Sequence, residues 1–321
     1  MTSMKPKLLL LLLIVCNAAT AQTWPAKPVR LILPFAAGGA VDVVTRITMN
    51  RVSEQTGQQF LVDNRPGASG NIGTEAAARS APDGYTFLVG SPGTIAINPH
   101  FYPTLPYDTL KDFVPVVHFA SFPQVLGVYA EVPAQNLAEL IAMARREPGK
   151  LNYGSGGNGS TGHLITEAFL RQAGIKITHV PFRGGGPAVQ GLAGGQVHLV
   201  IDGLPSFAAQ LQTGRIRVLA VTSKERWPEL PNVPSIGESA LPGFDMGSWA
   251  LIAAPAKTPD EILRRFAAET TKALAGEDVK ARLRQVGALP AGGTPEQALS
   301  FHRAEYEKWG NVVRSTGAKP D

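Results

Sequence analysis

Two glycine-rich loops hold the residues best suited to bind a ligand. The first spans 36–42 (Ala-Ala-Gly-Gly-Ala-Val-Asp) and the second spans 154–163 (Gly-Ser-Gly-Gly-Asn-Gly-Ser-Thr-Gly-His). Each follows a short apolar segment that predicts a strand, and each precedes a segment that predicts a helix. Free N–H groups and the positive end of such a helix attract anions, and glycine lets the ligand approach the backbone. The pair of loops therefore predicts a carboxylate held between two lobes.

Two aspartates could take part in this chemistry. Asp42 falls in the first turn of its predicted helix, where a carboxylate either stabilises the helix end or binds a ligand. Asp202 ends an apolar segment, where it either accepts hydrogen bonds from loop amides or accepts one from a ligand amine or hydroxyl. As an acid and base pair, Asp42 and Asp202 would suit an exported enzyme, and this remote alternative predicts turnover of a bound acid.

Other polar side chains near the second loop also have two readings. Ser160 or Thr161 is expected to cap the following helix, and contact with a ligand would be an additional role. His163 starts that helix and serves either the ligand or the core. Arg183, beside Gly184, either neutralises a carboxylate or stays in solvent.

Patterns typical of enzymes and of cofactor sites are missing. Gly154, Gly156 and Gly159 match the spacing of a dinucleotide loop, but no acidic residue follows about 20 positions later. No serine stands in a Gly-x-Ser-x-Gly pattern, and the six histidines show no metal-binding spacing. The single cysteine is Cys16. We therefore predict neither enzyme activity nor a cofactor nor a metal site.

The N-terminal residues 1–21 have the composition of a secretory signal peptide. Lys5 and Lys7 precede an apolar run at 8–15, and Ala19-Thr20-Ala21 resembles a cleavage site. Cleavage after Ala21 predicts a soluble protein in an exported compartment. A lipoprotein anchored through Cys16 is the less favoured alternative, because Val15 is bulky. The net charge of +5 is mild, without long basic runs, and does not predict nucleic-acid binding.

The remaining chain alternates strand-like and helix-like segments, which predicts an α/β protein with mostly parallel sheets. Asn136 is expected to cap a helix, and the segments 258–261 and 294–297 resemble capping boxes of two closing helices. Crossings between the lobes are expected near 121–123 and 242–247. The expected strands are Val29–Leu33, Phe60–Asp63, Thr86–Gly90, Val125–Ala130, Leu151–Tyr153, Ile177–Val180, Val197–Asp202, Val218–Val221 and Trp249–Ala254.

Several longer motifs resemble those of the substrate-binding proteins of tripartite tricarboxylate transporters, the TctC or Bug family of periplasmic receptors. The matching segments extend through nearly the whole mature chain and are 34–42, 63–73, 82–86, 105–108, 152–160, 179–184 and 194–197. The resemblance implies that the exported compartment is the periplasm and that the fold is a clam-like type II binding protein, with each lobe a mostly parallel sheet flanked by helices. Lobe 1 would comprise 22–122 and 245–321, and lobe 2 would comprise 123–244.

The resemblance also implies a ligand site and a partner. A small carboxylate would bind between the lobes of a monomer that docks transiently on membrane permease subunits. Gly203 after Asp202, and Val43-Val44 after Asp42, depart from the family pattern and leave the ligand open among di- and tricarboxylates, acidic amino acids and aromatic acids. A receptor for a membrane sensor kinase is the alternative. The implied contacts are Phe35, Gly38, Gly39, Asp42, Ser91, Thr94, Ser155, Gly157, Ser160, Thr161, His163 and Asp202.

Overall fold

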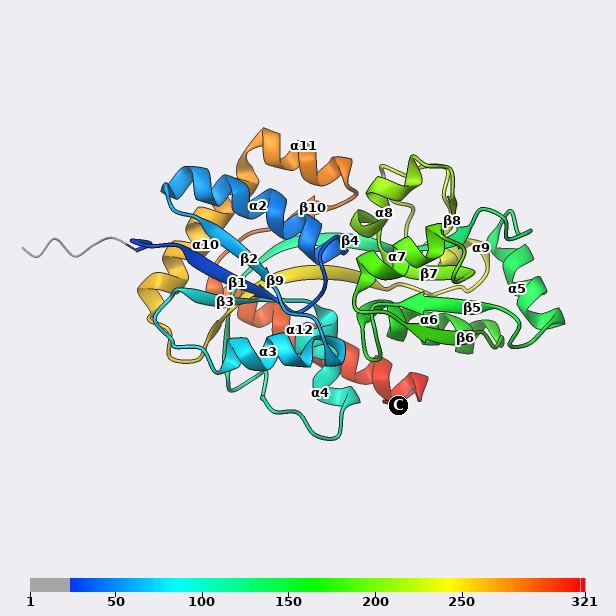
Figure 1. The fold of residues 1–321 in the computed structure, drawn as a ribbon, viewed down its shortest axis with the longest axis horizontal. Coiled ribbons are helices and arrows are strands. Elements are labelled where there is room, and N and C mark those ends of the chain that lie inside the picture. Colours follow the sequence, from blue (N-terminus) through cyan, green and yellow to red (C-terminus); the bar gives the residue numbers. More distant parts are fainter. Residues whose placement is uncertain (1–23, 318, 321) are drawn as a thin grey trace, which may run out of the picture.

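The structure is a computed structural model that describes residues 24–317 and 319–320. The expected signal peptide and its cleavage site lie outside these residues. The described chain forms an elongated α/β molecule with two lobes, and long strands connect them (Figure 1). This confirms the predicted fold class.

One mixed sheet runs through both lobes in the order β2-β1-β3-β9-β4-β7-β5-β6, with β8 and β10 also paired to β4. The pairings β1–β2, β1–β3, β5–β6 and β5–β7 are parallel. Strands β9 and β4 enter antiparallel to their neighbours. The strands are β1 (Val29–Leu33), β2 (Phe60–Asn64), β3 (Thr86–Gly90), β4 (Phe113–Tyr129), β5 (Asn152–Ser155), β6 (Thr178–Pro181), β7 (Leu199–Gly203), β8 (Ile216–Val221), β9 (Gly247–Pro255) and β10 (Leu289–Pro290).

Strand β4 belongs to both lobes. Its first part pairs with β9 as far as Pro123, opposite Gly247, and from Gln124 onward it lies between β7 and β8 and pairs with both. The sequence predicted only the second part, from Val125. Pro115 interrupts the pattern of the first part, and a register irregularity follows it between Pro115 and Val117. The long strand therefore carries the chain from one lobe to the other.

Helices cover both faces of the sheet (Figure 1). Strand β1 shows the division, because Leu31 and Leu33 pack with α2, α10 and α11, whereas Ile32 faces the opposite core with α3 and α12. The described α-helices are α2 (Ala40–Thr56), α3 (Asn71–Ala78), α4 (Asn98–Phe101), α5 (Leu137–Arg146), α6 (Thr161–Ala173), α7 (Gly185–Ala193), α8 (Leu204–Leu211), α9 (Ile236–Ser239), α10 (Asp260–Ala275), α11 (Glu277–Gln285) and α12 (Pro295–Thr316).

Local capping signals were partly right. Asn136 caps α5 by accepting a hydrogen bond from Glu139 N, and Thr294 forms the expected capping box on α12. The box expected at Thr258 is wrong, because the hydroxyl of this buried residue donates to Pro255 O at 2.7 Å and α10 begins without a side-chain cap. Three helices, rather than two, close the chain.

Candidate functional site

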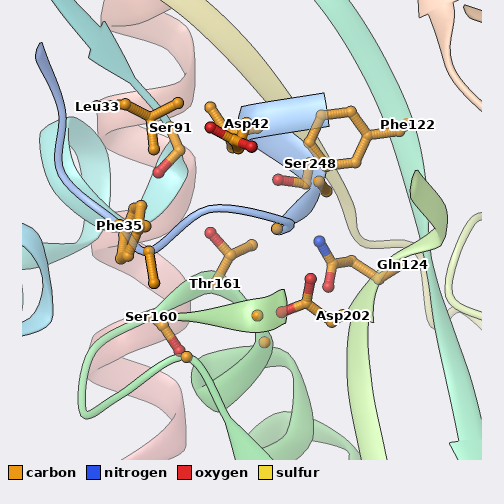
Figure 2. A pocket seen from close by; sticks show the side chains of 17 residues that line it. Leu33, Phe35, Asp42, Ser91, Phe122, Gln124, Ser160, Thr161, Asp202 and Ser248 are labelled. Carbon is orange, nitrogen blue, oxygen red and sulfur yellow. The ribbon is translucent and has the colours of Figure 1, made fainter. Parts of the chain in front are cut away.

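A cavity of about 50 Å³ lies where the two lobes meet (Figure 2). Its wall comes from the end of β1 and the first glycine-rich loop, from the residue directly after β3, and from the crossover strands β4 and β9. The other lobe contributes β7, the second glycine-rich loop and the first residues of α6 and α7. The lining residues are Leu33, Phe35, Ala36, Gly39, Ala40, Val41, Asp42, Ser91, Phe122, Gln124, Gly156, Ser160, Thr161, Gly162, Gly185, Asp202 and Ser248. We call this space the inner cavity.

Three helices begin at the inner cavity. Gly39 is the N-cap of α2, Ser160 is the N-cap of α6, and Gly185 is the first residue of α7. Neither α2 nor α7 has a side-chain cap, so their first N–H groups are not used by a capping side chain. None of the lining residues carries a positive charge. The positive potential at this site therefore comes from helix ends of both lobes.

Asp42 is held firmly within the first lobe. Its carboxylate accepts hydrogen bonds from Gly38 N at 3.0 Å, from Arg46 Nε at 3.0 and 3.1 Å, and from Asn64 Nδ2 at 3.0 Å. Burial alone would raise its pKa, but the hydrogen bonds from Arg46, Gly38 and Asn64 together hold the pKa below the ordinary value. Asp42 therefore fixes the shape of the glycine loop, and its acceptor capacity is taken by the protein.

Asp202, unlike Asp42, has no cationic side chain among the hydrogen-bond donors described for it. Its Oδ1 accepts hydrogen bonds from Gly203 N at 2.8 Å and from Ser206 Oγ at 2.7 Å. The side chain keeps some exposure to the inner cavity while protein surrounds it, and this burial raises its pKa to about 6, against the opposing effect of both hydrogen bonds. At neutral pH the Asp202 side chain is therefore ionised even though burial makes its charged form less favourable.

The second glycine-rich loop rests on a stack of aromatic rings. His163 stacks on His179 with 4.4 Å between ring centroids, and Tyr153 stacks with both, its centroid 4.7 Å from that of His179 and 6.5 Å from that of His163. Gly159 N donates to His163 Nδ1 at 3.1 Å, and Ser155 Oγ lies 2.6 Å from His179 Nε2. These side chains hold the loop from behind and do not line the inner cavity.

A second, outer cavity of about 290 Å³ shares Phe35 and Gly156 with the inner one. Arg183 is its one positively charged lining residue, and it is exposed. Ala68 and Ser69, on its rim, have φ values of 45° and 53°, a conformation that costs energy for side chains other than glycine. The residues lining it are Phe35, Gly67, Ala68, Ser69, Gly70, Tyr102, Gly156, Gly157, Asn158, Pro181, Phe182 and Arg183.

The two lobes touch directly around both cavities. Ala36 N donates to Arg183 O at 3.3 Å, and Gly93 N donates to Thr161 Oγ1 at 3.1 Å. A Cβ atom on Gly186 would lie 2.7 Å from the backbone carbon of Gly38. These distances describe a closed arrangement that needs glycine where the loops meet.

The residues implied by the sequence separate into three groups. Gly38, Thr94, Ser155 and His163 line neither cavity: Gly38 bonds to Asp42, and Thr94 Oγ1 bonds to the backbone of Ser91. Gly157 and Arg183 line the outer cavity. Those lining the inner cavity are Phe35, Gly39, Asp42, Ser91, Ser160, Thr161 and Asp202.

Sequence reasoning missed the residues contributed by the crossover strands. Phe122 and Gln124 on β4 and Ser248 on β9 all line the inner cavity, and Phe122 is paired with Ser248 across the two strands. A signal was available, because these residues lie in or next to the expected crossings. The strands between the lobes form the floor of the cleft, so their polar residues are candidates for ligand contact in the same way as those of the loops.

Two features are absent from residues 24–317 and 319–320. These residues contain no group of three or more histidine, cysteine, aspartate or glutamate side chains that could hold a metal ion. Within the same part of the chain, no helix combines the length and apolar composition needed to cross a membrane.

A two-lobed α/β fold with a cleft at the crossover strands defines the class of periplasmic binding proteins. Two solved structures of Rhodopseudomonas palustris proteins are similar to this chain. "R. palustris Rpa4515 with adipate" is 41% identical with a TM-score of 0.90, covering 93% of this chain and 100% of that one. "MatC (Rpa3494) from Rhodopseudomonas palustris with bound malate" is 32% identical with a TM-score of 0.86, covering 90% and 100%.

The chain belongs to the TctC family, whose model, described as "Tripartite tricarboxylate transporter family receptor", matches residues 44–318. Among similar proteins, the "UPF0065 protein in tcbD-tcbE intergenic region" of Pseudomonas sp. strain P51 is 40% identical over 298 residues, covering 92% of this chain and 88% of that protein. "Protein BugT" of Bordetella pertussis is 36% identical over 306 residues, covering 95% and 94%. The predicted relationship to the TctC and Bug receptors is confirmed.

Proposed function

We propose that this receptor captures a small carboxylate in the periplasm, between its two lobes, and delivers it to a tripartite tricarboxylate-type permease. The observation that carries the proposal is the meeting of α2, α6 and α7 N-termini from both lobes at one cavity. Backbone N–H groups at helix ends stabilise an anion without a cationic side chain. The adipate and malate named with two similar structures support a carboxylate ligand.

In this proposal the two cavities have different roles. The inner cavity is too small for a whole diacid and receives one polar end, while the outer cavity accommodates the body of the ligand next to Phe35 and Arg183. Ligand contacts are assigned to the residues predicted from the sequence that line either cavity, except Asp42, whose carboxylate holds its own loop. Thr94, Ser155 and His163 act by positioning the loops.

Closure of the lobes is the proposed signal to the permease. Lobe 1 comprises 22–122 and 245–321, lobe 2 comprises 123–244, and the hinge lies where β4 exchanges β9 for β7. Because the ligand contacts both lobes, it binds the closed state more tightly and shifts the balance toward it.

A thermal-shift screen of residues 22–321 against di- and tricarboxylates, acidic amino acids and aromatic acids tests the proposal. A ligand present at 100 times its dissociation constant stabilises the protein by about 2.7 kcal/mol. Isothermal titration calorimetry then gives the affinity, and chromatography of the recovered ligand checks that it is unchanged. A shift with sugars or cations, and with none of the acids, would contradict the proposal.

A further inference from the structure

Gln124 carries a buried side-chain amide for which the described residues show no hydrogen bond to the oxygen. It is 2% exposed, lies on β4 directly after the strand leaves β9, and lines the inner cavity. Its Oε1 has no hydrogen-bond partner in the described structure. Because a buried polar atom without a partner is costly, such a group usually indicates a missing ligand or water.

Polar side chains of two other strands are directed into the same space. Figure 2 shows the polar ends of Gln124 and Asp202 directed into the inner cavity, which Ser248 also lines. Ser248 is 5% exposed and comes from β9, so its hydroxyl faces the cavity from the other crossover strand. The two hydrogen bonds described for the Asp202 side chain both go to Oδ1.

The chemistry of this end of the cavity restricts what can bind there. Gln124 Oε1 and the Asp202 carboxylate require a donor, whereas the Gln124 NH₂ group requires an acceptor. A second carboxylate would face Asp202 with no cation in the lining. A hydroxyl group can both donate and accept, and it is small enough for a space of about 50 Å³.

We propose that Gln124, Ser248 and Asp202 form a hydroxyl-binding subsite, which makes the preferred ligand a hydroxycarboxylate. This inference rests on the proposed carboxylate receptor and specifies its ligand. The subsite lies on the crossover strands, so a hydroxyl bound there contacts the hinge as well as both lobes. Ligands without this hydroxyl leave Gln124 and Asp202 without the missing hydrogen bonds.

Matched acids that differ by one hydroxyl test the inference. Calorimetry is performed with malate and succinate, 2-hydroxyglutarate and glutarate, and 2-hydroxyadipate and adipate. In at least one pair the wild-type receptor binds the hydroxy acid at least tenfold more tightly. Gln124→Leu reduces this preference below threefold, with little change for the unsubstituted acid. Ser248→Ala lowers the affinity of the hydroxy acid by about three- to fivefold, and thermal unfolding verifies that both variants fold.

Gln190→Leu is the control, since Gln190 is exposed on α7 and lines neither cavity. It keeps the wild-type preference. If paired acids bind within threefold of each other and Gln124→Leu weakens both equally, the subsite holds only water, and the inference fails while the carboxylate receptor stands. If none of the six acids binds while another acid of the wider screen does, the inference fails and the carboxylate receptor stands; if no acid of either set binds, both proposals fail.

Discussion

Each side of the cleft contains an aspartate, and the surroundings shift the pKa values of the two carboxyl groups in opposite directions. Asp42 accepts hydrogen bonds from Arg46, Asn64 and the Gly38 backbone, and its pKa is lowered. Asp202 has one hydroxyl and one backbone donor, no cation, and a pKa raised to about 6. All acceptor positions of the Asp42 carboxylate bind groups of its own lobe, whereas Asp202 Oδ2 accepts no described hydrogen bond and can accept one from a ligand.

In the proposed receptor this difference gives Asp42 a structural role and Asp202 a binding role. The same difference argues against Asp42 and Asp202 as an acid–base pair, because the hydrogen bonds to Asp42 keep its carboxylate ionised and bound to the protein. The family comparison gives receptors with bound acids and not enzymes. Substitutions test this difference between the two sides of the cleft. They are made first where the lobes meet, then at each aspartate, and last at Gln124 on the crossover strand.

Gly186→Ala has the largest expected effect, because the two regions meet at this residue. Its Cβ would lie 2.7 Å from Gly38 C and 2.8 Å from Ala37 O in the other lobe. Closure is blocked, and ligand affinity falls about 100-fold, or roughly 2.7 kcal/mol. Calorimetry with the best ligand of the screen measures the loss. Gly194→Ala at the other end of α7, where the added Cβ meets nothing closer than 3.4 Å, keeps the affinity. Equal affinities would contradict the closed arrangement.

Asp42→Asn is expected to lower the free energy of unfolding by about 2 kcal/mol at pH 7, because the Arg46 ion pair and the loop hydrogen bonds weaken. A lowered pKa means that the ionised carboxylate stabilises the fold above its ordinary pKa near 4, and this stabilisation is lost as the pH falls below that range. Urea unfolding at several pH values measures the difference. Asp63→Asn, which breaks the half-exposed Arg65 pair, should change stability little.

Asp202→Asn is expected to act in the opposite direction, raising the free energy of unfolding at pH 7 by about 1 kcal/mol. A raised pKa means that the folded protein binds the proton more tightly than the unfolded chain between about pH 4 and pH 6. Wild-type stability therefore decreases as the pH rises through this window, and the variant lacks that decrease. Urea unfolding from pH 4 to pH 7 shows whether the two curves separate as expected. A variant less stable than wild type at pH 7 would remove the contrast with Asp42.

Gln124→Leu has the smallest expected effect on stability. Since its side-chain amide makes no described hydrogen bond, an apolar replacement of similar size should change the free energy of unfolding by less than about 0.5 kcal/mol or raise it slightly. Thermal unfolding without ligand measures this. A loss above about 2 kcal/mol would show that the amide has a structural partner.

Much of the architecture follows from local sequence. Apolar runs located most strands, and the residues 136 and 294 mark helix starts because a cap and its N–H partners lie within one turn. The first half of β4 was missed because Pro115 disturbs the local pattern while distant strands supply its pairing. Thr258 matched a cap locally but bonds to the preceding turn instead.

The sequence by itself determined the two glycine loops, their helices, and the pair of aspartates near them. Only the tertiary structure decided that Asp42 is saturated, that Asp202 is left with acceptor capacity, and that Gln124 and Ser248 face the same cavity. The physical reason is the distance along the chain over which each interaction acts. Helix ends and turns depend on neighbours a few residues away, whereas burial, and with it the demand for a hydrogen-bond partner, arises only when separate strands pack around one space.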